Sequence, residues 1–197
     1  MSKENSALLI VDLQNDFVHS DGAYGRAGQF SKEISILPNT IAPLAKVMRS
    51  NGNPVISTQF TLIPDKNGDP MIAGHLKKLR PFLKKGDFES GSWGNQMVDE
   101  LGNPDYVIEK IAYSAFYMTR LEWILRKINI QHLVVGGIVT NGGVASTVRN
   151  AHVLDFNTTI LSDGCAAFSE KTHANAISDL STVSDTGTCS ELIARFS

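Results

Sequence analysis

The sequence predicts an α/β fold, a three-layer α/β/α sandwich around a six-stranded, mostly parallel sheet. Two observations support this prediction: short aliphatic runs recur along the chain, and stretches whose apolar residues follow helical spacing lie between them. Unbroken apolar runs are typical of parallel strands that are covered on both faces. Alternation of such strands with helices produces right-handed crossovers and a sheet with helices on both sides.

The first predicted strand covers residues 7–11 and ends at Asp12. Later strands are predicted, in order, at 54–58, 106–109, 132–135, 158–161 and, with the weakest pattern, around 183–188. Helices are predicted at 36–49, 118–127, 144–154 and about 173–180, because apolar residues recur there every three or four positions. The sheet is therefore expected to be Rossmann-like, with 1–197 forming a single domain.

Residues 60–102 depart from this alternation, because proline and glycine interrupt every long element there. An excursion between two strands is a common place for a substrate lid or a pocket wall, and a purely structural insertion is equally compatible with the pattern. Trp93 lies in a Ser-Gly-Ser-Trp-Gly segment and is a candidate lid aromatic or oligomer contact.

Composition places the chain among globular proteins and argues against nucleic acid or a membrane as a partner. It has 42% hydrophobic and 19% charged residues and a net charge of -2, so a sizeable core is available and no basic surface is expected. Its two cysteines, Cys165 and Cys189, are too few for a disulfide framework. The polar start and the short first apolar run indicate neither a secretory leader nor a membrane span, so we expect a cytoplasmic protein.

Polar residues follow or end three predicted strands, namely Asp12, Gln59 and Lys110, and a glycine-rich turn at 137–143 follows a fourth. In parallel α/β sheets this edge carries the ligand crevice. Each residue alone has an ordinary interpretation as a turn residue or a solvated charge, and the joint placement is what predicts a site. The five histidines show no ligand spacing and are expected in surface or cap positions.

These segments resemble the isochorismatase-like hydrolase superfamily. The resemblance rests on residues 8–17, which read LLIVDLQNDF, on Lys110, and on residues 136–144, which read GGIVTNGGV. It runs from about residue 7 to the end of the chain. Most members are amidohydrolases with an Asp, Lys and Cys triad, in which a helix N-terminus and the Lys favour the thiolate. Asp12 matches that Asp, Lys110 matches the Lys, and Gly143 stands at the position of the cysteine.

Gly143 removes the nucleophile that a covalent thioester mechanism requires. Cys165 follows the next strand and is expected to be a core thiol. Nicotinamidases of the superfamily also bind a metal through an Asp-x-His pair after the second strand, where this sequence reads Gln59-Phe60-Thr61. We therefore expect no metal, no cofactor and no nicotinamidase activity.

True isochorismatases also carry Gly at this position, and they cleave a vinyl ether to release pyruvate. The resemblance therefore implies a small, anionic substrate, with Asp12 as the general acid and Lys110 beside it. The residues assigned to substrate binding are Phe17, Gln59, Tyr113, Ile138, Val139 and Gly142. A cis peptide bond is expected between Ile138 and Val139, and the amides of Gly142 and Gly143 are expected to form an oxyanion or carboxylate site.

Some features of this site stay open at the level of sequence. Val139 stands where isochorismatases typically have tyrosine, which removes a polar contact. Lys110 lowers the pKa of a neighbouring carboxyl group, whereas apolar burial raises it, and a general acid needs the second effect to dominate.

Three alternatives remain beside the ether-cleaving hydrolase. Amide hydrolysis by water that Asp12 activates is one, and a small-molecule binding protein that has lost its nucleophile is another. A thiol enzyme whose cysteine was replaced by design is less favoured, because Asn141-Gly142-Gly143 is typical of a native tight turn. A homodimer or homotetramer is expected, with residues 116–118 and Trp123 as a candidate contact.

Overall fold

The computed structural model describes residues 5–197 and is built around a six-stranded sheet with the strand order β3-β2-β1-β4-β5-β6. Every pair of neighbouring strands is parallel, so the sheet is more regular than the mostly parallel sheet predicted. The strands are β1 (Ser6–Val11), β2 (Val55–Phe60), β3 (Tyr106–Lys110), β4 (His132–Ile138), β5 (Asn157–Ala166) and β6 (Asp185–Gly187). All six correspond to predicted strands.

Strand β1 lies in the middle of the sheet and shows why the aliphatic runs form buried strands. Its six residues are all buried. Leu8 and Ile10 pack into the core on one face of the sheet, while Leu9 and Val11 pack into the core on the other face. Successive side chains of a strand point to opposite faces, so a strand between two helical layers needs apolar residues at every position.

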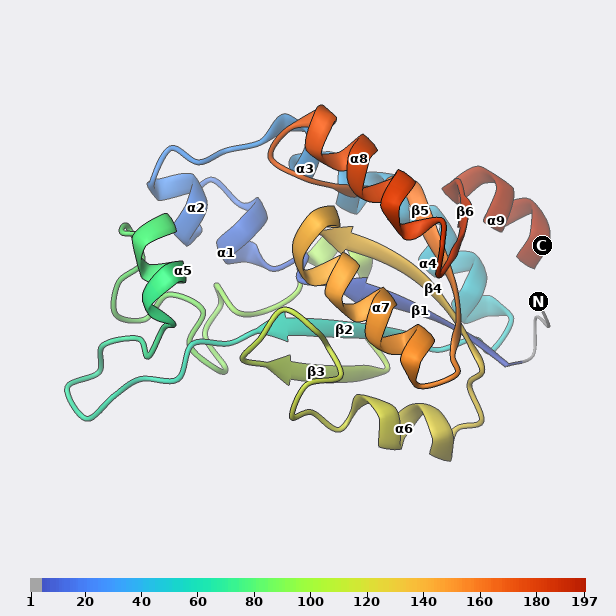
Figure 1. Ribbon diagram of the computed structural model, residues 1–197, viewed down its shortest axis with the longest axis horizontal. Coiled ribbons are helices and arrows are strands. Elements are labelled where there is room, and N and C mark those ends of the chain that lie inside the picture. Colours follow the sequence, from blue (N-terminus) through green and yellow to red (C-terminus); the bar gives the residue numbers. More distant parts are fainter. Residues whose placement is uncertain (1–4) are drawn as a thin grey trace.

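Helices cover both faces of the sheet (Figure 1). On one face α4 (Leu37–Ser50) and α9 (Cys189–Phe196) contribute residues such as Ile41 and Leu192 to one core cluster. On the other face α6 (Leu121–Lys127), α7 (Ala145–Val153) and α8 (Glu170–Leu180) contribute Leu125, Val148 and Leu180 to the second. This is the predicted three-layer sandwich.

The helix ends differ from the sequence prediction where capping side chains act. Helix α8 begins at Glu170, earlier than predicted, because the Ser169 side chain accepts a hydrogen bond from the amide of Thr172. The final helix α9 was not predicted. Thr188 and Glu191 form a reciprocal capping box at its start, and this Thr-x-x-Glu spacing is the sequence signal that identifies such a helix.

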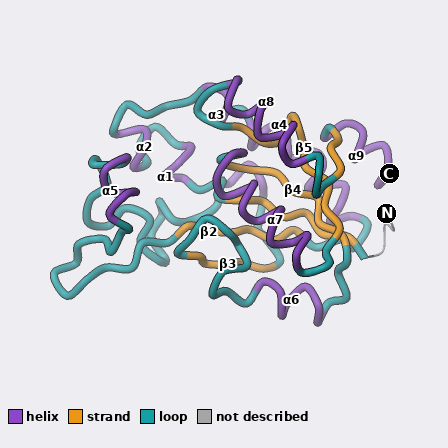
Figure 2. Tube along the Cα trace, viewed as in Figure 1, coloured by secondary structure: helices purple, strands orange, loops and turns teal. Residues whose placement is uncertain are grey.

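The long excursion after β2 contains little regular structure, as predicted. Between Phe60 and β3 the chain forms only the short helix α5 (Gly74–Leu79) and the single 3-10 turn η1 (Asp99–Leu101), and Figure 2 shows it mostly as loop. Three further short helices follow β1, and none of them was predicted: α1 (Asn15–Val18), α2 (Ala23–Arg26) and α3 (Lys32–Ser35).

A third, smaller apolar cluster joins these irregular segments. Tyr24, Leu62 and Phe88 are buried in it, and Phe17 and Phe60 pack against it. In Figure 1, α1, α2 and α5 lie beyond the carboxyl ends of the strands. The cluster therefore builds a wall at the edge of the sheet where the sequence predicts a site. Within residues 5–197, none of the helices combines the length and hydrophobicity that crossing a membrane requires.

Candidate active site

The candidate site lies at the carboxyl ends of β1 and β4, where the strand order changes direction. Helix α4 follows β1 on one face of the sheet, and α7 follows β4 on the opposite face. The two connections diverge and leave a crevice between the two strand ends, which is the usual ligand position in open α/β sheets. Asp12 follows directly after β1, and its φ of 57° places it in the left-handed region, which asparagine and aspartate adopt more readily than other side chains.

Asp12 and Lys110 form a buried ion pair. The Oδ2 atom of Asp12 lies 2.6 Å from Nζ of Lys110, and the two residues are 5% and 2% exposed. Thr58 donates a hydrogen bond of 2.7 Å to the other carboxylate oxygen, and the ammonium of Lys110 also donates to the carbonyl of Ala112 at 3.0 Å. Three neighbouring strands, β1, β2 and β3, thus hold one carboxyl group in a fixed position.

Burial raises the pKa of Asp12 above its ordinary value, although Lys110 and the hydrogen bond from Thr58 act in the opposite direction. Removal of the carboxylate from water disfavours its charged form, while the adjacent cation favours it. The sequence left open whether burial or Lys110 dominates the pKa of Asp12, and in the structure burial dominates. A carboxyl group with a raised pKa keeps its proton to higher pH, as a general acid requires.

The turn after β4 forms the opposite side of the crevice. Its Ile138–Val139 peptide bond is cis, as predicted, and residues Thr140–Val144 form a π-helical turn, η2, that leads into α7. Within this turn the amide of Gly142 donates to the carbonyl of Val139 at 2.9 Å. The predicted role of the Gly142 amide as a free donor to the pocket is therefore wrong, because a local turn bond already uses this N–H group.

Glycine at position 137 permits the approach of β4 to β1. Its φ is 122°, and a Cβ atom there would lie 2.1 Å from the carbonyl oxygen of Val11. No side chain fits at that distance, so the turn reaches the end of β1 only with glycine at this position.

Gly143 places its α-carbon close to the Asp12 carboxyl group. A Cβ atom at this position would lie 3.2 Å from Oδ2 of Asp12, 3.0 Å from the carbonyl oxygen of Ile138 and 3.3 Å from Cγ1 of Val11. Any side chain here would point at the Asp12 carboxyl group, as the family's cysteine is expected to do. These three distances are shorter than ordinary packing distances. A side chain at position 143 would therefore require its neighbours to move by a few tenths of an ångström.

An open, mostly apolar pocket lies above Asp12, and the space between its lining atoms, including the part open to solvent, is about 460 Å³. Aromatic rings form one wall: Phe17 lies 4.5 Å from Phe88 and 4.8 Å from Tyr24 between ring centroids, and Phe60 lies 5.5 Å from Phe88. The ammonium of Lys110 lies 5.5 Å from the centre of the Phe60 ring. The lining residues are Asp12, Phe17, Tyr24, Phe60, Leu76, Arg80, Leu83, Phe88, Lys110, Tyr113, Ile138, Val139 and Gly143.

Most of the predicted site residues meet in this pocket, namely Asp12, Phe17, Lys110, Tyr113, Ile138, Val139 and Gly143. Gln59 does not. Its neighbours Thr58 and Phe60 face Asp12 and the pocket, whereas Gln59 lines a separate hollow with Gln96 and Val107. Side chains alternate along a strand, so Gln59 cannot share the orientation of its neighbours.

Several lining residues were missed by sequence reasoning. The alternation along β2 identifies Thr58 and Phe60 once the direction of Asp12 is known. The others come from the short helices α2 and α5 or from loops, and no periodic signal places them: Tyr24, Leu76, Arg80, Leu83 and Phe88. Residues 60–102 thus supply a pocket wall, one of the two roles expected of them. Trp93 is not among the lining residues; it packs against His19 with ring centroids 4.9 Å apart.

Two further titratable side chains, Cys165 and His132, are buried away from the pocket. Cys165 is a buried core thiol, as predicted, and burial raises its pKa. His132 departs from the predicted surface or cap role, because it is buried and shares a hydrogen bond of 2.9 Å with Thr159. Among residues 5–197, no group of three or more His, Cys, Asp or Glu side chains is arranged to hold a metal ion.

Comparisons with known proteins agree with this fold. Residues 6–190 match the family model described as the isochorismatase domain. Over 188 residues the chain is 30% identical to a probable inactive nicotinamidase of Arabidopsis thaliana, covering 91% of this chain and 89% of that protein. Over 179 residues it is 34% identical to the ureidoacrylate amidohydrolase RutB of Cronobacter turicensis, covering 81% and 74%.

A solved structure shows the same fold. The crystal structure of a cysteine hydrolase from Pseudomonas syringae superposes with a TM-score of 0.84 at 20% identity, covering 100% of this chain and 94% of that chain. The match of the family model spans nearly the whole chain, and the strand order, the cis peptide bond and the buried Asp12–Lys110 pair accompany it. The chain belongs to the isochorismatase family of hydrolases.

Proposed function

We propose that the protein hydrolyses a small anionic vinyl ether without a cofactor or a covalent enzyme intermediate. One observation carries the proposal: the buried Asp12 carboxyl group, held 2.6 Å from Lys110, faces Gly143 where a thiol nucleophile is otherwise expected. A vinyl ether becomes reactive when its terminal carbon is protonated, so a positioned acid suffices for this reaction.

The proposed reaction begins with transfer of the Asp12 proton to the methylene carbon of the substrate. A C–H bond forms, and the positive charge is shared between the adjacent carbon and the ether oxygen. Lys110 stabilises the Asp12 carboxylate that this step leaves, because its ammonium is in direct contact. The apolar wall of the pocket keeps bulk water from the carboxyl group and supports its raised pKa.

Water then adds to the cationic carbon and gives a proton to the Asp12 carboxylate, which restores the acid. The resulting hemiketal breaks its bond to the ether oxygen and releases an alcohol and a keto acid. In total, one vinyl ether and one water yield one alcohol and one keto acid. The amide of Gly143 is the remaining predicted backbone donor for an oxygen that carries charge in these steps.

The test is release of pyruvate from isochorismate, followed through NADH oxidation with lactate dehydrogenase. We expect turnover by the wild-type protein and a loss of about 100-fold or more in Asp12→Asn, the range typical of a removed general acid. Asp179→Asn makes the same chemical change at an exposed position of α8 and is the matched control. Turnover that persists in Asp12→Asn would exclude Asp12 as the acid.

A second candidate reaction is hydrolysis of an amide by water that the ionised Asp12 activates. The 34% identity to a ureidoacrylate amidohydrolase favours it. It predicts ammonia release from ureidoacrylate-like amides instead of pyruvate release from isochorismate. The two reactions also need opposite protonation states of Asp12, so their pH dependence separates them.

A third candidate is binding without turnover, which the similarity to a probable inactive nicotinamidase favours. It predicts that small carboxylates raise the melting temperature while none of the tested ethers or amides is consumed. Ligand-induced stabilisation with no product in either assay would favour this role over both hydrolytic reactions.

A further inference from the structure

Arg80 is an arginine at the pocket without an acidic partner. It follows the last residue of α5, and its side chain lines the pocket with Leu76 and Leu83. No carboxylate of the described residues lies within salt-bridge distance of Arg80, in contrast to Arg26, which pairs with Asp87 at 2.5 Å, and Arg126, which pairs with Glu122 at 2.9 Å.

Only one hydrogen bond of the Arg80 guanidinium is made within the part of the chain that the structure describes. Its Nε atom donates to the hydroxyl oxygen of Tyr24, and the guanidinium carbon lies 5.8 Å from the centre of the Tyr24 ring. The terminal Nη1 and Nη2 groups are the two parallel donors that match a carboxylate. Tyr24 therefore fixes the orientation of the side chain and leaves its end for a ligand.

The charges of the pocket favour an anion. Lys110 is already paired with Asp12, and burial raises the pKa of Tyr24 to about 12, so this phenol is neutral at neutral pH. Arg80 is thus an uncompensated positive charge among the lining residues. An anionic ligand group gains more from this charge than a neutral group of the same shape does, because the surrounding wall is apolar.

The wall beside Arg80 indicates the rest of the ligand. The partly buried rings of Phe17 and Phe60, whose centroids are 6.4 Å apart, line the pocket between Tyr24 and the Lys110 ammonium, and the fully buried Phe88 ring packs behind them. Such a surface favours a flat, unsaturated body.

We infer that Arg80 is the specificity-determining residue of the pocket and binds the carboxylate of a planar, unsaturated carboxylic acid. The body of this ligand lies against the Phe17 and Phe60 rings. The placement of its reacting bond at Asp12 rests on the proposed function, whereas the carboxylate site itself does not. Arg80 follows α5 and Tyr24 lies in α2, so the pocket selects its ligand through short elements outside the regular sheet.

Binding of two probes of equal shape tests this inference without any turnover. Benzoate and nitrobenzene are both planar, but only benzoate is charged. Isothermal titration calorimetry of the wild-type protein is expected to show benzoate binding at least 10-fold more tightly than nitrobenzene. In Arg80→Gln we expect benzoate affinity to fall about 10-fold or more while nitrobenzene affinity changes little, and Arg80→Lys should recover part of the loss.

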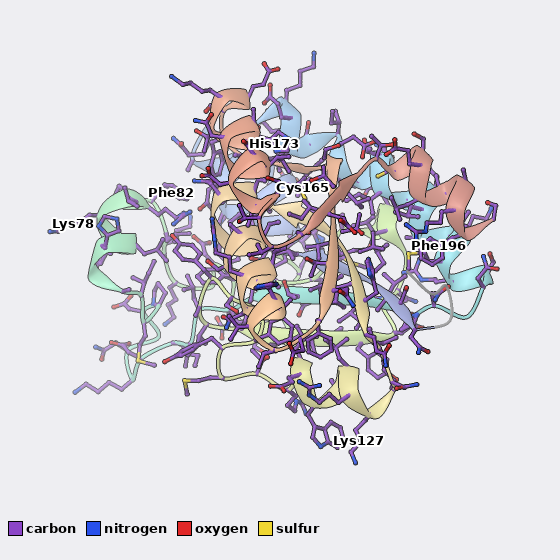
Figure 3. The ribbon with its side chains drawn as sticks, turned by 45° about the vertical axis from the view of Figure 1, so that its right-hand side comes forward. Lys78, Phe82, Lys127, Cys165, His173 and Phe196 are labelled. Carbon is purple, nitrogen blue, oxygen red and sulfur yellow. The ribbon has the colours of Figure 1, made fainter. Side chains whose placement is uncertain are left out.

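Lys78→Gln is the matched control. Lys78 lies on α5 two residues before Arg80, and it extends away from the body of the molecule (Figure 3). The Lys78→Gln substitution removes one positive charge from α5, two residues before Arg80. It should leave benzoate affinity within about twofold, because exposed charges are screened by salt. The melting temperature of Arg80→Gln, measured in parallel, shows that the variant is folded.

The results separate this inference from the proposed reaction. Benzoate binding that depends on Arg80, together with no pyruvate release from isochorismate, keeps the carboxylate site and removes the ether reaction. Equal binding of benzoate and nitrobenzene, absence of benzoate binding, or equal losses in Arg80→Gln and Lys78→Gln would overturn the role of Arg80. Pyruvate release that is the same in wild type and Arg80→Gln would also overturn the role of Arg80, while leaving the proposed reaction supported.

Discussion

At the scale of single residues, two opposing effects act on the pKa of Asp12. The cation of Lys110 and the hydroxyl of Thr58 favour its carboxylate, and burial beneath aromatic side chains favours its carboxylic acid. Burial dominates, so the pKa is raised. A group with a raised pKa loses its proton at higher pH, and an acid-dependent reaction therefore declines as pH rises through that value.

Thr58→Val shifts this decline in a predictable direction. The hydrogen bond from Thr58 lowers the pKa of Asp12, so its removal raises the pKa further and moves the falling limb of kcat/KM for isochorismate to higher pH. Valine keeps the branched shape that suits β2. The measurement is the pH dependence of kcat/KM in wild type, Thr58→Val and the control Thr158→Val, which changes a buried threonine of β5.

The direction in which kcat/KM changes with pH shows whether Asp12 acts as an acid or as a base. An activity that rises with pH through the same pKa would show that the ionised carboxylate acts as a base, as amide hydrolysis by activated water requires. If the falling limb of kcat/KM lies at the same pH in Thr58→Val and wild type, Asp12 does not control the pH dependence.

At the scale of elements, the pairing of β4 with β5 buries a histidine. His132 begins β4 and shares a hydrogen bond with Thr159 on β5. Burial lowers its pKa to about 4 from the usual 6.5. The native chain therefore excludes a proton that the unfolded chain accepts, and the resulting stability is present above pH 6.5 and is lost as the pH falls toward 4.

We expect the free energy of unfolding to fall by about 2 kcal/mol between pH 7 and pH 5 on account of His132 alone. In His132→Gln this component should disappear, since glutamine keeps a hydrogen-bonding side chain but does not titrate. Urea unfolding at several pH values measures it. His75→Gln, at an exposed position in α5, is the control, and equal pH slopes in wild type and His132→Gln would contradict the assignment.

The whole molecule presents a group of exposed apolar side chains near α6. Tyr117, Met118 and Trp123 are 56%, 77% and 64% exposed, and Tyr113, which lines the pocket, is half exposed beside them in the sequence. Exposed apolar patches often mark contacts between proteins. We propose that this patch is the contact of a homodimer or homotetramer.

Light scattering coupled to size-exclusion chromatography tests this assembly. The wild-type protein should elute with the mass of two or four chains, and Trp123→Glu should shift it to one chain, because a buried unpaired carboxylate disfavours the contact. Ile63→Glu, at an apolar position in the excursion after β2 that is 47% exposed, should have no effect. A wild-type protein that remains monomeric at high concentration would exclude the proposed assembly.

The sequence by itself determined the regular part of this protein. Continuous apolar runs predict the central strands β1 and β4, because strands buried on both faces need apolar residues at nearly every position, whereas the edge strand β6 has the weakest signal. Strand ends then predict the edge that holds Asp12, Lys110 and the Gly143 turn, since parallel strands bring their carboxyl ends together. These signals are local or periodic, and they can be read without knowledge of long-range contacts.

The tertiary structure decided what such signals do not contain. The orientation of Gln59 away from the pocket, the use of the Gly142 amide by Val139, and the burial of His132 each depend on neighbours that are distant in sequence or on turn geometry. Arg80 reaches the pocket from an irregular segment with no period, held by a contact with Tyr24. The direction of the Asp12 pKa depends on how completely side chains from several elements exclude water, and this is a property of the assembled fold.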